Sequence, residues 1–270
     1  MIQTRSRVLE HVPLAEKTYR IRLSAPTIAA KILPGQFLML KLPGLNDPLL
    51  GRPFAVYDVD FEQQAIDVVY LVIGKMTTLL QEISPGQELE IWGPLGNGFP
   101  ELSPGPEAIF VAGGIGQTPF LAYAHQLLGT KGFGGRAAKR VIDKVTLYYG
   151  VRNKNLLAGV SDFEKAGVQV KVASDDGSVG YHGLVTGLLE QDPPKAPIIT
   201  CGPEPMLKAV SKLAEKYGVP CYVSLETPMA CGFGACFSCV TAVKTPEGVD
   251  YKRVCIDGPV FEASKLVWGH

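Results

Sequence analysis

Residues 108–119 are Ala108-Ile-Phe-Val-Ala-Gly-Gly-Ile-Gly-Gln-Thr-Pro119, an apolar run followed by a glycine turn and the start of a helical pattern. Glycines at such a turn let the backbone approach a pyrophosphate at the N-terminus of the helix. The spacing differs from the G-x-G-x-x-G fingerprint, so a tight turn without a ligand remains the alternative for this segment taken alone. The contacts expected here are Gly113, Gly114, Gly116 and Thr118.

The same alternation of buried strands and helices continues along the chain. Further strands are predicted at 145–149, 169–173 and 197–200, and helices at 119–128 and 204–217. This alternation is typical of a doubly wound parallel sheet with crossover helices, and we assign it to residues 101–222. The strand at 197–200 leads into a second turn, so two turns meet at one edge of the sheet and form one nucleotide crevice. Its expected contacts are Cys201, Gly202 and Pro203, with packing and a place beside a nicotinamide ring both open for Cys201.

Residues 1–100 have a different pattern, short β-type runs separated by turns. The runs lie at 19–23, 37–42, 54–59, 65–72 and 88–92, and the turns include Pro34-Gly35 and Pro85-Gly86. Such runs predict a small antiparallel barrel or sandwich, and we expect an N-terminal antiparallel β-barrel.

Two segments of this barrel have the chemistry of a flavin site. One is Arg52-Pro53-Phe54-Ala55, where a guanidinium at the start of a strand can bind a phosphate bidentately while the following backbone lines a flat ring. The other runs from Val69 to Thr78 and ends in a glycine turn followed by hydroxyls, which can hold a pyrophosphate. Residues 93–99, Gly-Pro-Leu-Gly-Asn-Gly-Phe, are expected to close the barrel.

Four cysteines mark a third unit, residues 223–270. Cys231, Cys236 and Cys239 have the spacing C-x4-C-x2-C, and fifteen residues separate the last of them from Cys255. Thiolates are soft ligands, and this spacing with a distant fourth cysteine is the plant-type pattern for a 2Fe-2S cluster. Tetrahedral zinc is the alternative, although zinc ribbons prefer paired C-x2-C knuckles. The sequence therefore predicts a carrier of single electrons.

Composition excludes several classes of protein. The chain has 26 basic and 26 acidic residues, so it lacks the excess of Lys and Arg that binding to nucleic acid requires. No export signal precedes the first strand, and no apolar run approaches the roughly 20 residues that span a bilayer. We therefore expect a cytoplasmic protein without nucleic-acid or membrane partners, in a reducing compartment that favours metal binding by cysteines.

Taken in order, these motifs resemble the ferredoxin-NADP-reductase superfamily. The tail narrows the resemblance, because Ser224-Leu225-Glu226, the cysteine segment and the segment Asp257-Gly258-Pro259 look like those of the electron-transfer subunits of class B dihydroorotate dehydrogenase. The resemblance implies FAD contacts at Arg52, Pro53, Phe54, Ala55, Val69, Tyr70, Leu71, Met76 and Thr77, and the four cysteines as cluster ligands. Ala55 stands where the family usually has Ser or Thr, and Met76 where glycine is usual, so each would remove or replace one flavin contact of about 1 kcal/mol.

The resemblance also implies a relay. Electrons would pass between NAD, FAD, the 2Fe-2S cluster and the FMN of a separate dihydroorotate dehydrogenase subunit, in a heterotetramer of two copies of each chain that serves pyrimidine (UMP) biosynthesis. No catalytic acid or base is expected on this chain, and its four histidines lie in no motif.

Two other functions remain open from the sequence. One is the small subunit of an NADH-dependent ferredoxin:NADP oxidoreductase or of a sulfide dehydrogenase, and the other is a non-catalytic zinc-binding regulator. NADP is also open as the nucleotide, because Arg152 and Lys154 follow the second α/β strand without a clear acid. The polar, glycine-rich connection 129–140 has no predicted role.

Overall fold

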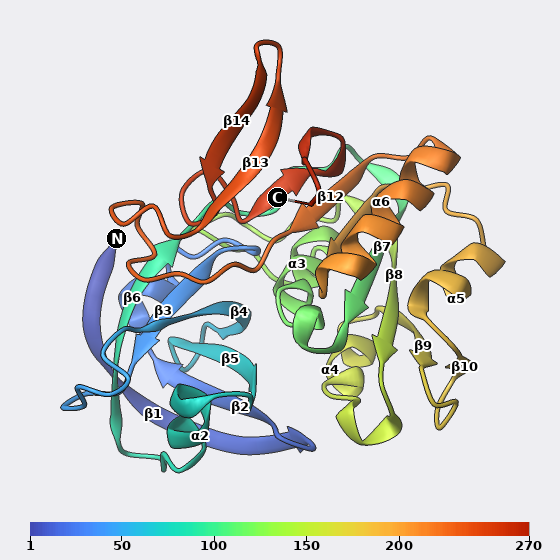
Figure 1. The fold of residues 1–270 in the computed structure, drawn as a ribbon. Helices are drawn as coiled ribbons and strands as arrows, with labels where there is room; N and C mark the ends of the chain where they lie inside the picture. The colour runs from blue at the N-terminus through green and yellow to red at the C-terminus, as the bar shows by residue number, and fades with distance from the viewer. Residues whose placement is uncertain (270) are drawn as a thin grey trace.

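Six strands of the first hundred residues close into an antiparallel barrel in the computed structural model, which describes residues 1–269 (Figure 1). Around the barrel the order is β1-β2-β5-β4-β3-β6. The strands are β1 (Ile2–Ala15), β2 (Thr18–Ser24), β3 (Phe37–Lys41), β4 (Arg52–Asp60), β5 (Ala65–Leu71) and β6 (Glu88–Leu95), with helices α1 (Pro26–Ala29) and α2 (Lys75–Gln81) between them. The predicted barrel is confirmed.

Strand β1 is the part of the barrel that the sequence did not predict. Of its first eight residues only Ser6 and Val8 are buried, so one of the two inward positions is polar and the hydrophobic alternation is weak. Its backbone is held by long ladders to β2 and β6 on its two sides.

The second half of the chain forms a seven-stranded sheet with the order β10-β9-β8-β7-β11-β12-β15. All neighbouring strands are parallel except the last pair, β12 and β15. The strands are β7 (Gly105–Gly113), β8 (Ile142–Val151), β9 (Gln169–Ser174), β10 (Tyr181–His182), β11 (Ile198–Cys201), β12 (Cys221–Ser224) and β15 (Val260–Glu262). The predicted parallel sheet is confirmed.

Helices cover both faces of this sheet. They are α3 (Phe120–Leu128), α4 (Val160–Lys165), α5 (Val185–Gln191) and α6 (Glu204–Tyr217). Successive residues of β7 point to opposite faces, so Phe110 packs with α3 and α4 whereas Val111 packs with α5 and α6. This is the doubly wound arrangement, with a hydrophobic core on each side of the sheet.

The cysteine segment is tied to this sheet rather than standing apart from it. It contains the hairpin β13 (Val240–Thr245) and β14 (Gly248–Arg253), and β15 then returns to pair with β12. The expected boundary at 222/223 falls inside β12, so the predicted limits 1–100, 101–222 and 223–270 stay a working division of the chain.

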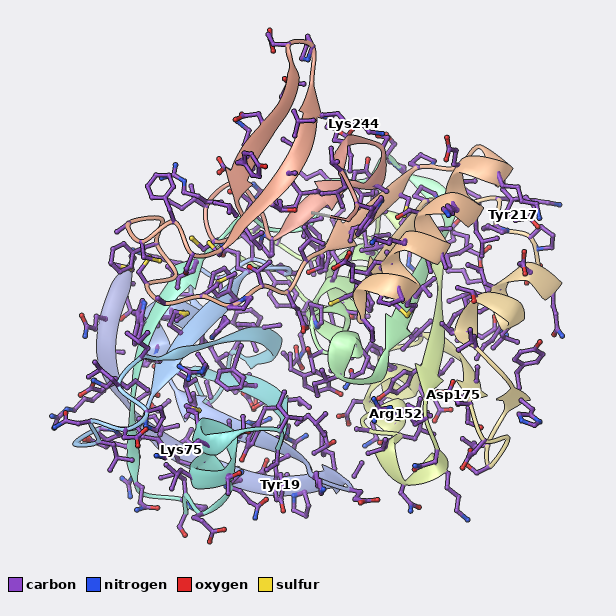
Figure 2. The ribbon with its side chains drawn as sticks, in the orientation of Figure 1. Tyr19, Lys75, Arg152, Asp175, Tyr217 and Lys244 are labelled. Carbon is purple, nitrogen blue, oxygen red and sulfur yellow. The ribbon has the colours of Figure 1, made fainter. Side chains whose placement is uncertain are left out.

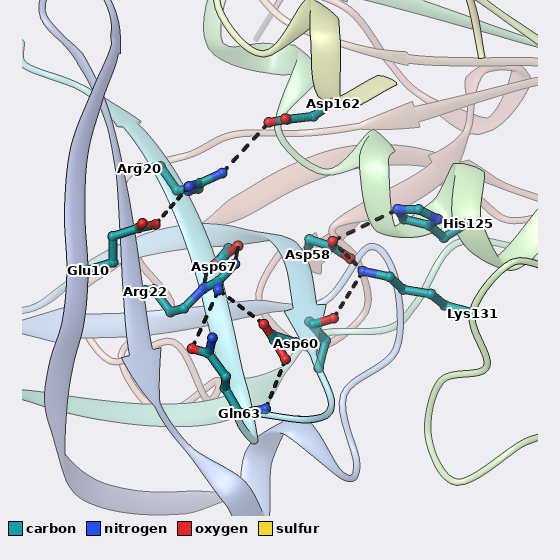
Figure 3. Close-up of polar contacts among 11 residues, drawn as sticks. Glu10, Arg20, Arg22, Asp58, Asp60, Gln63, Asp67, His125, Lys131 and Asp162 are labelled. Atoms are coloured by element: carbon teal, nitrogen blue, oxygen red, sulfur yellow. Dashed lines mark hydrogen bonds and ion pairs between the residues drawn. The ribbon is translucent and has the colours of Figure 1, made fainter. Parts of the chain in front are cut away.

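Charged contacts join the barrel to the α/β sheet (Figure 3). Asp162 of α4 accepts a hydrogen bond of 2.9 Å from the Tyr57 hydroxyl and lies 4.0 Å from the Arg20 guanidinium. On the other side, Asp58 of β4 pairs with Lys131 and lies 3.9 Å from the His125 ring. Burial lowers the pKa of His125, so the Lys131 ammonium is the main partner of Asp58.

The connection 129–140 packs against the barrel. Phe133 is buried in the barrel core and contacts the Phe61 ring edge-on at a centroid distance of 5.7 Å. Lys131 also donates to the Val59 carbonyl at 3.2 Å. This segment, which had no role from sequence, therefore fastens the two halves of the chain together.

None of the helices within residues 1–269 is long and apolar enough to cross a membrane.

Candidate functional site

A cavity of about 540 Å³ lies where the barrel, the α/β sheet and the cysteine segment meet. The barrel contributes most of the predicted flavin residues, the sheet contributes the ends of β11 and β12, and residues 225–229 with Pro259 complete the lining. Of the sixteen predicted cofactor contacts, the cavity brings together Arg52, Pro53, Phe54, Ala55, Val69, Tyr70, Leu71, Met76, Thr77, Thr118 and Cys201. Ala55 and Met76, the two departures from the family pattern, both line it.

Arg52 presents a guanidinium at the rim of this cavity. Its Nη1 donates to the carbonyls of Leu50 and Gly51, at 3.0 and 3.1 Å, which fixes the plane of the group. No carboxylate within residues 1–269 forms an ion pair with Arg52, so its remaining donors are available to a phosphate. The observation fits the predicted contact with a flavin nucleotide.

The Tyr70 ring forms part of the cavity lining and is held from behind by His11. The His11 Nδ1 bonds the Ile83 carbonyl at 2.7 Å, and because a carbonyl only accepts, Nδ1 carries the proton. The other ring nitrogen, Nε2, hydrogen-bonds the Tyr70 hydroxyl at 2.8 Å. Burial raises the pKa of Tyr70, so this hydroxyl stays protonated. Phe54 packs edge-on against Tyr70 at 6.1 Å, which fixes both rings.

The turn before α2 is closed by Thr77. Its hydroxyl accepts from the N–H groups of Ile73 and Gly74, at 3.0 and 3.1 Å, and donates to the Gly74 carbonyl at 2.9 Å. The hydroxyl is therefore used within the turn, and any contact of Thr77 with a pyrophosphate would come from its backbone.

Two groups on the sheet side of the cavity have altered acidity. The Cys201 thiol is buried and donates to the Glu226 carboxyl at 3.8 Å, and burial raises its pKa well above the ordinary value. Glu226 lines the cavity, and desolvation by the surrounding protein raises the pKa of its carboxyl more than the hydrogen bond from Cys201 lowers it. A protonated Glu226 could give a proton to a group bound in the cavity.

Thr227 supplies an unpaired hydroxyl in the same lining. Its Oγ1 is buried and has no hydrogen-bond partner among the described residues. A buried hydroxyl without a partner costs about 1–3 kcal/mol, so a polar ligand that bonds it would recover that cost. The donor and acceptor groups of the cavity thus fit a flavin with a phosphate tail.

The remaining five predicted contacts lie beside the cavity. Gly113, Gly116 and Gly202 meet where β7 and β11 end, and a Cβ on Gly116 would lie 2.3 Å from the Cys201 carbonyl oxygen. No side chain fits there, because the turn at Gly116 packs directly against the backbone at the end of β11. Pro203 lies against Gly113, and Gly114 has open space around it. These residues lie at the carboxyl ends of β7 and β11, beside Thr118 and Cys201 of the cavity lining, and their contact with a nicotinamide nucleotide stays a prediction.

The four predicted ligand cysteines lie in two pairs. Cys231 perturbs the pKa of Cys236, and Cys239 that of Cys255, and the Cys236 sulfur also lies 3.1 Å from the Ser238 hydroxyl. Hydrogen bonds from Ser238, and then from Cys231, lower the pKa of Cys236 to about 6, whereas burial and the Cys239 thiol raise that of Cys255 to about 12. Within residues 1–269 no three possible ligand side chains converge on one point, so the ligand set rests on its chemistry and spacing.

Backbone groups around the thiols suit a cluster. The backbone of Gly234 lowers the pKa of Cys255, and the backbone of Ser238 lowers that of Cys236. Gly234 has φ = +83°, and a Cβ there would lie 2.1 Å from the Ile256 side chain. Amide-to-sulfur bonds favour the thiolate form and tune the potential of a bound cluster.

The cysteine segment rests on the barrel next to the flavin cavity. The Trp92 indole donates to the Cys231 carbonyl at 2.9 Å, and Asn97 donates to the carbonyls of Ile256 and Asp257, at 2.9 and 3.2 Å. The loop 93–99 therefore holds the cysteine segment. Phe37, Leu225 and Met229 line the cavity and belong to the same apolar cluster as Cys239 and Cys255.

Sequence reasoning missed part of the lining. The missed residues are Gly35, Phe37, Ile73, Gly74, Lys75, Ile115, Pro119, Ser224, Leu225, Glu226, Thr227, Pro228, Met229 and Pro259. Ser224–Glu226 stood next to the cysteine motif and at a strand end, which was the available signal. Phe37 gave none, because an inward aromatic residue in a barrel strand is ordinary core.

Three families match successive parts of the chain. An oxidoreductase FAD-binding domain matches residues 7–99, an oxidoreductase NAD-binding domain residues 110–212, and the iron-sulfur cluster binding domain of dihydroorotate dehydrogenase B residues 226–267. These matches agree with the predicted order of FAD, NAD and iron-sulfur units.

Relatives match the chain over nearly its whole length. The dihydroorotate dehydrogenase B (NAD(+)) electron transfer subunit of Geobacillus thermodenitrificans is 39% identical over 97% of this chain and 98% of its own. The subunit of the same name from Bacillus caldolyticus is 40% identical over 94% of each chain. Among solved structures, a chain of the NADH-dependent reduced ferredoxin-NADP oxidoreductase superposes with a TM-score of 0.82 and 26% identity, over 97% of this chain and 90% of that one.

Proposed function

We propose that this chain, which belongs to the family of dihydroorotate dehydrogenase B electron transfer subunits, carries electrons between NAD and a separate catalytic subunit. That subunit would bind FMN and oxidise dihydroorotate. This would place the chain in de novo pyrimidine (UMP) biosynthesis. The observation that supports the relay most directly is the shared lining: the flavin cavity and the apolar cluster around Cys239 and Cys255 have Phe37, Leu225 and Met229 in common.

Each of the three units has one task in this proposal. FAD, when bound, exchanges electron pairs with a nicotinamide and single electrons with a 2Fe-2S cluster. Arg52 and the turn at 73–77 hold the phosphates, while Phe54 and Tyr70 line the flavin. Cys231, Cys236, Cys239 and Cys255 hold the cluster. The chain itself binds no dihydroorotate, and its own residues orient the cofactors and exclude water.

The surface around the cysteines supports a partner that docks there. Phe233, Phe237 and Ile256 are exposed apolar residues beside the ligand cysteines, and Cys236 itself is exposed. Single electrons travel only short distances, so the partner's FMN would have to approach this face. We place the complex in the cytoplasm, as a heterotetramer of two copies of each subunit.

Coexpression with an FMN-binding dihydroorotate dehydrogenase tests the assignment. We expect the two chains to copurify, with a mass of two copies of each by light scattering, and to form NADH from dihydroorotate and NAD. Copurification with a larger flavin and iron-sulfur subunit, without turnover of dihydroorotate, would contradict it.

That outcome would favour the second candidate, the small subunit of an NADH-dependent ferredoxin-NADP oxidoreductase. The candidate is kept because a chain of such an enzyme superposes over 97% of this one.

A further inference from the structure

The predicted nucleotide contacts at the ends of β7 and β11 do not by themselves show which end of the dinucleotide lies over which strands. The order of the strands in the sheet determines this orientation. At the carboxyl edge the order is β9-β8-β7-β11-β12, and the flavin cavity touches the ends of β11 and β12 through Cys201 and Ser224. A nicotinamide that meets the flavin must therefore lie on the β11 side of the Gly113 turn. The adenosine must lie on the other side, over the ends of β8 and β9, about 10 Å away at two strand spacings.

The ends of β8 and β9 carry opposite charges side by side. Arg152 follows β8 and Asp175 follows β9, and Figure 2 shows the two residues next to each other at this edge. Backbone hydrogen bonds lock the two strand ends together, from the Asp175 N–H to the Val151 carbonyl at 3.0 Å and from the Asp176 N–H to the Arg152 carbonyl at 3.2 Å. The sequence after β8 contains no clear acid to contact the ribose, and Asp175 at the end of the neighbouring strand β9 supplies one at the same edge.

The two neighbouring aspartates differ in what they bind. Asp176 accepts the Ser178 N–H at 2.9 Å, and the Ser178 hydroxyl in turn accepts the Lys154 N–H at 2.8 Å. The hydrogen bonds from Ser178 lower the pKa of Asp176, so this carboxylate is committed to its own turn. The exposed carboxylate of Asp175 has no hydrogen-bond or ion-pair partner among residues 1–269.

We propose that Asp175 accepts hydrogen bonds from the adenosine ribose hydroxyls and thereby selects NAD over NADP. A carboxylate can accept from both hydroxyls of a ribose, whereas a 2′-phosphate would bring a second negative group against it. Arg152 contacts the adenosine without deciding the choice. This inference rests on the proposed function, because the direction of the dinucleotide follows from the flavin cavity.

Calorimetry on the full chain with its FAD and cluster tests the inference without relying on turnover. NAD and NADP are titrated into the wild-type chain and into Asp175→Asn, Asp175→Ala and Arg152→Ala. In Asp175→Asn the preference for NAD falls about tenfold, because the repulsion of the 2′-phosphate is removed. In Asp175→Ala the affinity for NAD itself also falls about tenfold, because both acceptor atoms are lost. Arg152→Ala weakens both nucleotides equally.

Asp143→Asn is the matched control, since Asp143 is an exposed aspartate near the start of β8, at the opposite edge of the sheet. The preference of the Asp143→Asn variant for NAD over NADP should equal that of the wild-type chain. An unaltered preference in both Asp175 variants, or a selective loss of NADP binding in Arg152→Ala, would overturn the inference. A wild-type chain that binds neither nucleotide would instead contradict the proposed function.

Discussion

The Thr227 hydroxyl, which has no hydrogen-bond partner among the described residues, predicts that its removal raises the stability of the FAD-free chain and weakens FAD binding. Replacing Thr227 by valine keeps the shape of the side chain and removes the hydroxyl, which is buried and has no protein partner within residues 1–269. In the chain without FAD the hydroxyl costs about 1–3 kcal/mol, so Thr227→Val should raise stability by about 1 kcal/mol. With FAD bound, the same change removes a hydrogen bond of about 1 kcal/mol and should weaken FAD binding about fivefold.

Two assays measure the two effects on one preparation. The urea midpoint of the FAD-free chain reports stability, and titration of that chain with FAD, followed by quenching of flavin fluorescence, reports affinity. Thr146→Val is the control, because the buried Thr146 hydroxyl donates to Glu107 at 2.7 Å and Thr146 does not line the cavity. The control should lose stability and keep its FAD affinity. A lower midpoint for Thr227→Val, or an unchanged affinity, would refute the reasoning.

Three further changes test other parts of the molecule. Ala55→Ser restores the hydroxyl usual in the family and should tighten FAD binding about fivefold by titration, whereas no change would mean that the hydroxyl does not reach the flavin. The pKa of Glu226 is raised, so its carboxyl stays protonated at pH values where an ordinary glutamate is ionised, and it loses the proton as pH rises through the raised pKa. The rate of flavin reduction by NADH should fall over the same pH range in the wild type, and it should stay level in Glu226→Gln. Phe133→Ala should cost about 3–5 kcal/mol in urea unfolding because the ring is buried in the barrel core, while Arg136→Ala on the same connection should cost under about 1 kcal/mol; equal losses would argue against Phe133 as the anchor.

The sequence predicted those strands and helices whose apolar residues follow a clear periodic pattern. Strands β7, β8, β9 and β11 are apolar because both faces of the sheet are covered, and helices α3 and α6 carry long apolar patterns. Strand β1 was missed because Ser6 occupies an inward position, its hydroxyl satisfied by the Ser24 carbonyl at 2.7 Å. Helices α4 and α5, of six and seven residues, are too short for their periodicity to stand out.

The site divides in the same way. Arg52, the glycine turns and the cysteine spacing carry their chemistry in the local sequence, so their roles could be predicted before the fold was known. Glu226 and Asp175 could not, because their positions depend on which strands are neighbours in the sheet. Asp175, the acid proposed to contact the nucleotide, follows β9 rather than β8. Glu226 belongs to the segment before the cysteines, which forms one wall of the cavity.

Anaerobic reduction followed by electron paramagnetic resonance tests the relay most directly. The assembled complex with its catalytic subunit is given dihydroorotate without NAD, and the isolated chain is given dihydroorotate or NADH in separate samples. We expect a reduced 2Fe-2S signal and flavin bleaching in the complex with dihydroorotate, and in the isolated chain with NADH alone. A complex whose flavins are reduced while no iron-sulfur signal ever forms, or an isolated chain that oxidises dihydroorotate by itself, would contradict the account.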